Sequence, residues 1–154
     1  MAATQAGFLN FIRGNMGIPV PYLPDDADVI GMAFQVANSI VNPALQNVAA
    51  NPTLSPPLTI FDLAVYNLAG DQLLNYAQDQ PGQNYFAGLR EKYKLTSFIS
   101  GVTTASYDQG TGQTTLNPEF MKELMLSDLQ NMKTPYGRQY LAFAQRYGTL
   151  WGMS

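Results

Sequence analysis

The residues that most enzymes use for proton transfer, nucleophilic attack and metal binding are scarce in this chain. It contains no histidine and no cysteine, which excludes imidazole catalysis, thiolate chemistry and the usual zinc and haem ligands. The densest acidic cluster is Asp25, Asp26 and Asp28. A calcium loop supplies about six to eight oxygen ligands at defined positions, whereas these carboxylates stand at the expected start of a helix, where negative charge is favourable. We therefore interpret the cluster as a helix start and not as a metal site.

Two further patterns resemble catalytic motifs but lack the required context. Residues 108–112 are rich in glycine, but no Gly-Lys-Ser/Thr sequence follows them, as a phosphate-binding loop would require. Glu119 and Glu123 stand one turn apart on one expected helix, which does not place two acids on opposite sides of a cleft. Lys122 and Lys133 occupy positions that look exposed, whereas a catalytic lysine is usually desolvated. The sequence predicts a protein that is not an enzyme and needs no cofactor.

Hydrophobic spacing and turn signals divide the chain mostly into helices. The spacing predicts helices over 3–13, 25–41, 60–78, 84–94, 118–133 and 135–147, with a short helical piece at 44–50. Two β-favouring runs around a Gly-rich turn predict a hairpin or extended loop near 96–116. Pro19, Pro21 and Pro24 predict a stiff, extended connector that is either a linker or an arm lying on a neighbour.

These elements define the expected fold class and domain organisation. We expect a mainly α protein, a small bundle of about five helices with one hairpin and an extended N-terminal arm. Residues 1–24 would form the first helix and the Pro-rich arm. Residues 25–154 would form a single helical domain into which the hairpin is inserted.

Apolar periodicity also predicts which side of each helix faces the core. The helix over 60–78 has an apolar face wide enough to pack on two sides, and Gly70 lies inside it. In the helix over 84–94, three basic residues are expected to point outward: Arg90, Lys92 and Lys94. In the helix over 25–41, the expected core residues are Ile30, Ala33, Phe34, Ala37, Ile40 and Val41.

The composition favours a surface that contacts other proteins. Only 12% of the residues are charged, and an amide-rich surface costs little to desolvate, although a low-charge monomer fits the same composition. Between Gly14 and Leu89 there are six aspartates and no basic residue, whereas from Arg90 onward there are seven basic and five acidic residues. This asymmetry fits either a solvated surface or head-to-tail contacts between copies, in which an acidic face meets a basic one.

Candidate contact residues fall in the Pro-rich segment, the hairpin tip and the C-terminal helix. Tyr, Trp and Arg are enriched at interface hot spots, but an aromatic stripe at helical spacing is equally typical of a core. The expected interface residues are Pro19, Pro21, Tyr22, Tyr107, Asp108, Tyr136, Arg138, Tyr140, Arg146, Tyr147 and Trp151. No window approaches the roughly 18 apolar residues of a membrane span, and residues 1–17 lack the pattern of a signal peptide. We therefore expect no contact with a membrane.

Four segments give the chain its resemblance to a known family: residues 23–42, 64–71, 116–120 and 133–140. In sequence texture and element order, the chain resembles the head-to-tail connector proteins of tailed bacteriophages, which are also called neck, adaptor or collar proteins. The resemblance covers most of the chain and involves no diagnostic catalytic motif.

The resemblance implies a structural subunit made in the host cytoplasm and incorporated into the virion. Such subunits form a ring, usually of twelve or six copies, beneath the portal. The ring continues the DNA channel and contacts the DNA passively. Arms or hairpins dock onto the portal above or onto the adjacent neck or tail protein below.

Two other functions fit the same residues. The chain could be another virion protein, such as a tail terminator, a baseplate protein or a minor capsid protein. It could also be a host-directed binding protein that acts as a monomer.

Overall fold

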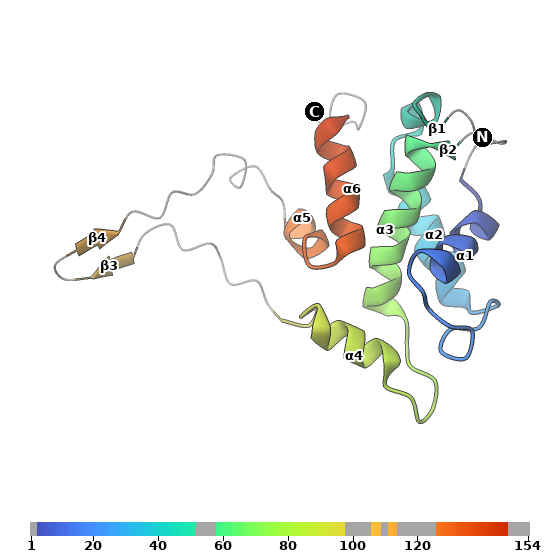
Figure 1. The fold of residues 1–154 in the computed structure, drawn as a ribbon, viewed down its shortest axis with the longest axis horizontal. Coiled ribbons are helices and arrows are strands. Elements are labelled where there is room, and N and C mark those ends of the chain that lie inside the picture. Colours follow the sequence, from blue (N-terminus) through green and yellow to red (C-terminus); the bar gives the residue numbers. More distant parts are fainter. Residues whose placement is uncertain (1–2, 52–57, 98–105, 109–110, 114–125, 148–154) are drawn as a thin grey trace.

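The computed structural model describes residues 3–51, 58–97, 106–108, 111–113 and 126–147 and confirms a mainly helical fold (Figure 1). The helices and strands, in chain order, are α1 (Gln5–Gly14), α2 (Asp28–Ile40), the 3-10 helix η1 (Pro43–Asn47), β1 (Ala49–Asn51), β2 (Leu58–Thr59), α3 (Ile60–Tyr76), α4 (Tyr85–Lys92), β3 (Ser106–Asp108), β4 (Thr111–Gln113), α5 (Leu126–Asn131) and α6 (Pro135–Arg146). Each described helix lies within, or within about one residue of, a predicted helical segment. The short antiparallel pair β1–β2 was not predicted.

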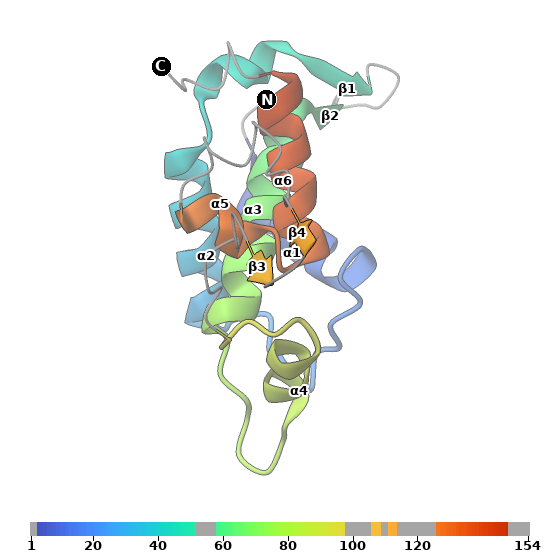
Figure 2. The ribbon, with the colours of Figure 1, turned by 90° about the vertical axis from the view of Figure 1, so that its left-hand side faces the viewer.

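Helix α3 is the centre of the helical body. It begins with a capping box, in which Thr59 Oγ1 accepts a hydrogen bond from the Asp62 backbone N–H (3.1 Å) and an Asp62 carboxylate oxygen accepts one from the Thr59 N–H (2.9 Å). Figures 1 and 2 both show α3 between α2 and α6. Apolar residues on several sides of α3 are consequently buried, as its wide apolar face predicts.

Gly70 lies where α1 and the residues just after it approach α3. A Cβ at this position would lie 3.2 Å from the Met16 sulfur and 3.5 Å from the Phe11 ring. An alanine here would require the Met16 side chain to shift by a few tenths of an ångström. The glycine that weakens the sequence prediction of a continuous helix therefore lies at a close contact within the body.

The Pro-rich segment after α1 differs from the extended connector that the sequence predicts. It turns back on the body, and Ile18 and Leu23 are buried in the core. Arg13 holds this turn, because its guanidinium donates to the carbonyl of Ile18 (2.7 Å) and to that of Leu23, and it also pairs with Asp25. The burial of Ile18 and Leu23 and the hydrogen bonds of Arg13 thus hold the Pro-rich segment against the body.

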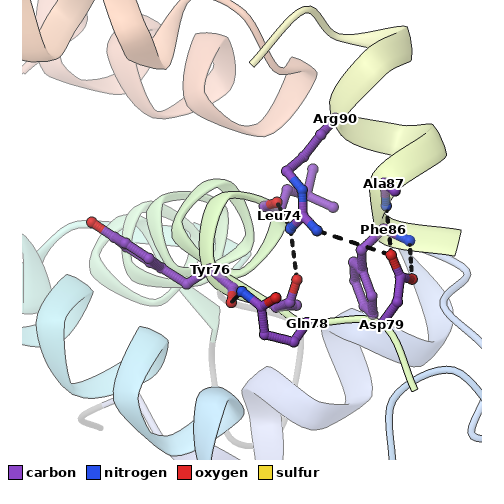
Figure 3. Close-up of polar contacts among 8 residues, drawn as sticks. Leu74, Tyr76, Gln78, Asp79, Phe86, Ala87 and Arg90 are labelled. Carbon is purple, nitrogen blue, oxygen red and sulfur yellow. Dashed lines mark hydrogen bonds and ion pairs between the residues drawn. The ribbon is translucent and has the colours of Figure 1, made fainter. Parts of the chain in front are cut away.

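Helix α4 is attached to the end of α3 by two charged side chains (Figure 3). Asp79 accepts hydrogen bonds from the N–H groups of Phe86 (2.7 Å) and Ala87 (2.9 Å), which have no partner inside the first turn of α4. Arg90 points inward, donates to the carbonyl of Ala77 (2.6 Å) and lies 4.0 Å from the Asp79 carboxylate. The prediction that Arg90 points outward is therefore wrong, whereas Lys92 and Lys94 are exposed as predicted.

Helix α6 begins with the local signals that the sequence contains. Thr134 caps α6, because its Oγ1 accepts a hydrogen bond from the Gly137 N–H (2.9 Å), and Pro135 opens the helix. A Cβ at Gly137 would overlap the Asn131 backbone, so the tight turn from α5 to α6 requires glycine there. The predicted helix start at residues 117–119 lies outside the described residues, as do Lys122 and Glu123.

The predicted hairpin is present as the antiparallel pair β3–β4, in which Tyr107 is opposite Gly112 and Asp108 is opposite Thr111. Figure 1 shows these two strands set apart from the helical body. The insertion between α4 and α5 therefore places a small sheet at a distance from the core.

Candidate assembly surfaces

The C-terminal helix α6 has one side in the core and one side in solvent. Tyr140 is buried, and Tyr136 is half-buried. The rings of Tyr136 and Phe11 form a T-shaped pair with their centres 6.1 Å apart. Arg138 and Arg146 are exposed. Of the candidate residues on α6, Tyr140 therefore belongs to the core and Tyr136 packs against it, whereas the two arginines are on the surface.

The exposed side of α6 contains a row of three residues that we call the α6 row: Arg138, Ala142 and Arg146. They are spaced four residues apart, so they lie on one side of the helix. Arg146 also lies over the half-buried ring of Tyr147, at 5.8 Å from the ring centre. Trp151 is outside the described residues.

The candidate contact residues in the Pro-rich segment also divide into exposed residues and a residue that packs within the chain. Pro19 and Pro21 are exposed, whereas Tyr22 is half-buried and stacks on Tyr85 with ring centres 4.4 Å apart. Tyr22 therefore fastens the segment to α4 inside the same chain. The two prolines remain accessible to a neighbour.

Tyr107 and Asp108, two further candidates, belong to β3, and the described residues that flank the whole insertion contact each other. Lys133 donates from Nζ to the carbonyl of Leu95 (3.3 Å) and to that of Ser97, and Gln130 donates to the Leu95 carbonyl (3.4 Å). Lys133 is half-buried, which corrects the prediction of an exposed position. These contacts hold the end of α4 against the α5–α6 turn.

Sequence reasoning missed an apolar row on the outer side of α2. Met32, Val36 and Ile40 are 50%, 40% and 53% exposed, and with the exposed Asp28 they are spaced four residues apart. We call these four residues the α2 row. The prediction that Ile40 faces the core is wrong, because Ile40 is the last residue of α2 and is 53% exposed, whereas Ile30, Ala33 and Ala37 earlier in the helix are buried. The signal was present in the sequence, since α2 is apolar on more than one side.

An open hollow of about 420 Å³ lies beside the first half of the α2 row. Asp25, Asp26 and Asp28 line it together with Met32 and Val36. Asp25 is paired with Arg13, and Asp28 lies in the first turn of α2. In the part of the chain that the structure describes, no group of three or more acidic side chains is arranged to hold a metal ion. The three aspartates that line the hollow make the Asp28 end of the α2 row acidic.

One carboxyl group in the core has an unusual environment. Asp71 on α3 is fully buried, accepts a hydrogen bond from the Thr134 hydroxyl and has the Asn75 amide 3.5 Å from its other oxygen. Burial raises its pKa from 3.8 to about 6, and the Thr134 hydrogen bond opposes that rise. Because the group is inaccessible to a substrate, we interpret it as a link between α3 and the start of α6.

No protein-family model, curated protein or solved structure matches this chain. Among the helices that the structure describes, none is both long enough and apolar enough to cross a membrane.

Proposed function

We propose that the chain is a non-enzymatic structural subunit of a tailed-phage neck, which forms a ring between the portal and the tail and continues the DNA channel. The observation that carries the proposal is the hairpin β3–β4, which is set apart from a helical body with its own core (Figure 1). A body with its own core can take a place in a ring, while a separate hairpin can reach the next protein.

The hairpin is a poor candidate for an isolated structure. Its two strands have three residues each and pair with each other. A lone two-stranded hairpin is at best marginally stable in water. Docking on the portal or on the adjacent neck or tail protein would supply the missing packing surface, and edge pairing with a partner strand would satisfy the remaining backbone groups.

The assignment to a phage neck rests on the resemblance of the sequence, and the fold agrees with what that resemblance implies. A small helical body with an inserted hairpin is the expected arrangement of such subunits. The surfaces also suit contact more than chemistry, because the described acids pair with arginine, cap helices, lie in the core or stand on an open face.

Light scattering of the full chain, alone and with the portal protein of the same phage, tests the proposal. The expected result is a ring-sized species, or a complex that forms when the portal is present. A chain that stays monomeric and ignores the portal would contradict the proposal. Absence from purified virions would favour a host-directed binding protein, and another position in a particle reconstruction would indicate a different virion part.

A further inference from the structure

The α2 row is an unpartnered apolar surface with a charged end. Its three apolar side chains are each at least 40% exposed and extend over about 12 Å of helix, given a rise of 1.5 Å per residue. Single exposed apolar residues are common, but aligned ones beside a hollow are typical of an interaction site. Asp28 ends the row, and Asp25 and Asp26 line the same hollow.

The α6 row is basic and therefore complements the acidic end of the α2 row. Arg138 and Arg146 are exposed on either side of Ala142, whose side chain is much shorter than theirs. The aliphatic stems of arginine can cover apolar surface while the guanidinium group stays polar. Arg138 is also near the positive end of α6, where a positive charge is unfavourable unless an acid lies nearby.

The two rows lie on helices that run in the same direction. In Figures 1 and 2, α3 separates α2 from α6, and the sequence colours show that both helices run antiparallel to α3. Because α3 lies between the two helices, a contact between the rows requires a second copy. Two copies related by rotation about an axis that is parallel to α3 and outside the molecule can bring the α2 row of one beside the α6 row of the next, with the helices parallel.

We propose that the α2 row of one copy docks on the α6 row of the next copy, as the head-to-tail contact of the ring. This inference rests on the proposed function. In parallel register, Asp28 lies at the level of Arg138, Met32 at that of Ala142 and Val36 at that of Arg146. Met32 packs against Ala142, and the arginine stem covers Val36. Such a contact joins two different surfaces, so it repeats from copy to copy and closes into a ring where the rotation permits.

Complementing variants test this geometry. Val36→Lys damages the α2 row, because it sets a positive charge beside Arg146 of the next copy, and the double change Arg138→Glu with Arg146→Glu damages the α6 row, because it sets a negative charge beside Asp28. Each variant alone should self-associate at least about tenfold more weakly than the native chain, because like charges then face each other across the contact. A mixture of the two should form a one-to-one dimer and nothing larger, since each retains the row that the other lacks. Sedimentation velocity measures all three states, and circular dichroism confirms that the variants fold.

Val20→Lys is the matched control. It makes the same change at a valine that is 52% exposed but lies in the Pro-rich segment, outside both rows. Self-association should be unchanged. Equal losses for Val20→Lys and Val36→Lys, or a mixture that stays monomeric where the native chain associates, would overturn the proposal.

Cysteine crosslinking tests the same contact when the free chain associates only weakly, because a disulfide traps the associated form. The native chain has no cysteine, so only the introduced cysteines can react. Met32→Cys mixed with Ala142→Cys should give an oxidised heterodimer in clear excess over Val20→Cys mixed with Ala142→Cys. Equal yields from both mixtures would overturn the contact. If the pair fails to crosslink but the chain still binds the portal, the docking geometry is wrong and the neck assignment stands. If it crosslinks but the chain is absent from virions, the contact stands and the neck assignment fails.

Discussion

At the residue scale, the most constrained group is the buried carboxyl of Asp71. It is fully enclosed, and its clearest partner is the hydroxyl of Thr134, which also caps α6. One threonine thus fixes both the start of a helix and its position against α3. Removing a buried partner leaves an unsatisfied polar group, which costs about 1–3 kcal/mol or more when the group is charged.

The raised pKa of Asp71 predicts a specific pH dependence of stability. The folded chain holds the proton up to about pH 6, whereas the unfolded chain releases it near 3.8. The contribution of this group is therefore most favourable below pH 4 and is lost as the pH rises through 6, by roughly 3 kcal/mol at most. Asp71→Asn removes this dependence, so the variant should gain stability relative to the native chain between pH 4 and 7. Urea unfolding across that range measures the difference.

Asp26→Asn is the control for this measurement, because it removes the same charge from an exposed position. The difference between Asp71→Asn and Asp26→Asn should change steadily between pH 4 and 7. A difference that is constant with pH would show that Asp71 titrates alike in the folded and unfolded chains.

At the element scale, the body depends on side chains that close the ends of helices. Arg90 satisfies the carbonyl of Ala77 just after α3, and Asp79 satisfies the first N–H groups of α4 (Figure 3). The two charged groups also face each other at 4.0 Å. The angle between α3 and α4 is therefore set by a pair of polar side chains as well as by apolar packing around Phe86.

Replacing Arg90 tests the importance of this junction. Arg90→Met keeps most of the side-chain volume but removes the donors to the Ala77 carbonyl and the partner of Asp79. We expect a loss of about 1.5–3 kcal/mol in the free energy of unfolding, the range for hydrogen bonds to charged groups. Lys92→Met, on the exposed side of the same helix, should change it by less than about 0.5 kcal/mol. Similar effects of the two substitutions in denaturant unfolding would argue against the junction.

At the scale of the whole molecule, the body and the hairpin are separate structural units. The core combines α1, α2, α3, α4 and α6, whereas β3 and β4 pair with each other at a distance from these helices (Figure 1). Lys133 and Gln130 hold the end of α4 against the α5–α6 turn. Changes in the hairpin should therefore leave the body intact.

A hairpin-shortened variant makes this separation measurable. Replacing residues 106–113 by a short Gly-Ser linker should leave the melting temperature within about 2 °C, because the strands β3 and β4 lie apart from the helical body (Figure 1). The same variant should lose binding to the portal, if the hairpin is the docking element. Lys133→Met, which loosens the base of the insertion, provides the comparison and should lower the melting temperature. A large drop for the hairpin variant would mean that the hairpin packs on the helices.

The sequence by itself determined the features that depend on neighbours along the chain. The caps at Thr59 and Thr134 use hydrogen bonds over three residues, so their spacing is visible in the sequence. The hairpin and most of the helix bounds follow from turn residues and periodicity in the same way. The absence of histidine and cysteine excludes certain chemistries before any fold is considered.

Only the tertiary structure decided which of several plausible sides of an element is covered. Ile40 is apolar but exposed, Arg90 is charged but turned inward, and the Pro-rich segment is fastened by Arg13. Asp71 and Thr134 meet although 63 residues separate them. Local spacing gives the two apolar sides of α2, but the position of α3 determines which is buried. The α2 row is therefore one of the apolar sides that local spacing indicates, and packing between distant segments decided that it stays exposed.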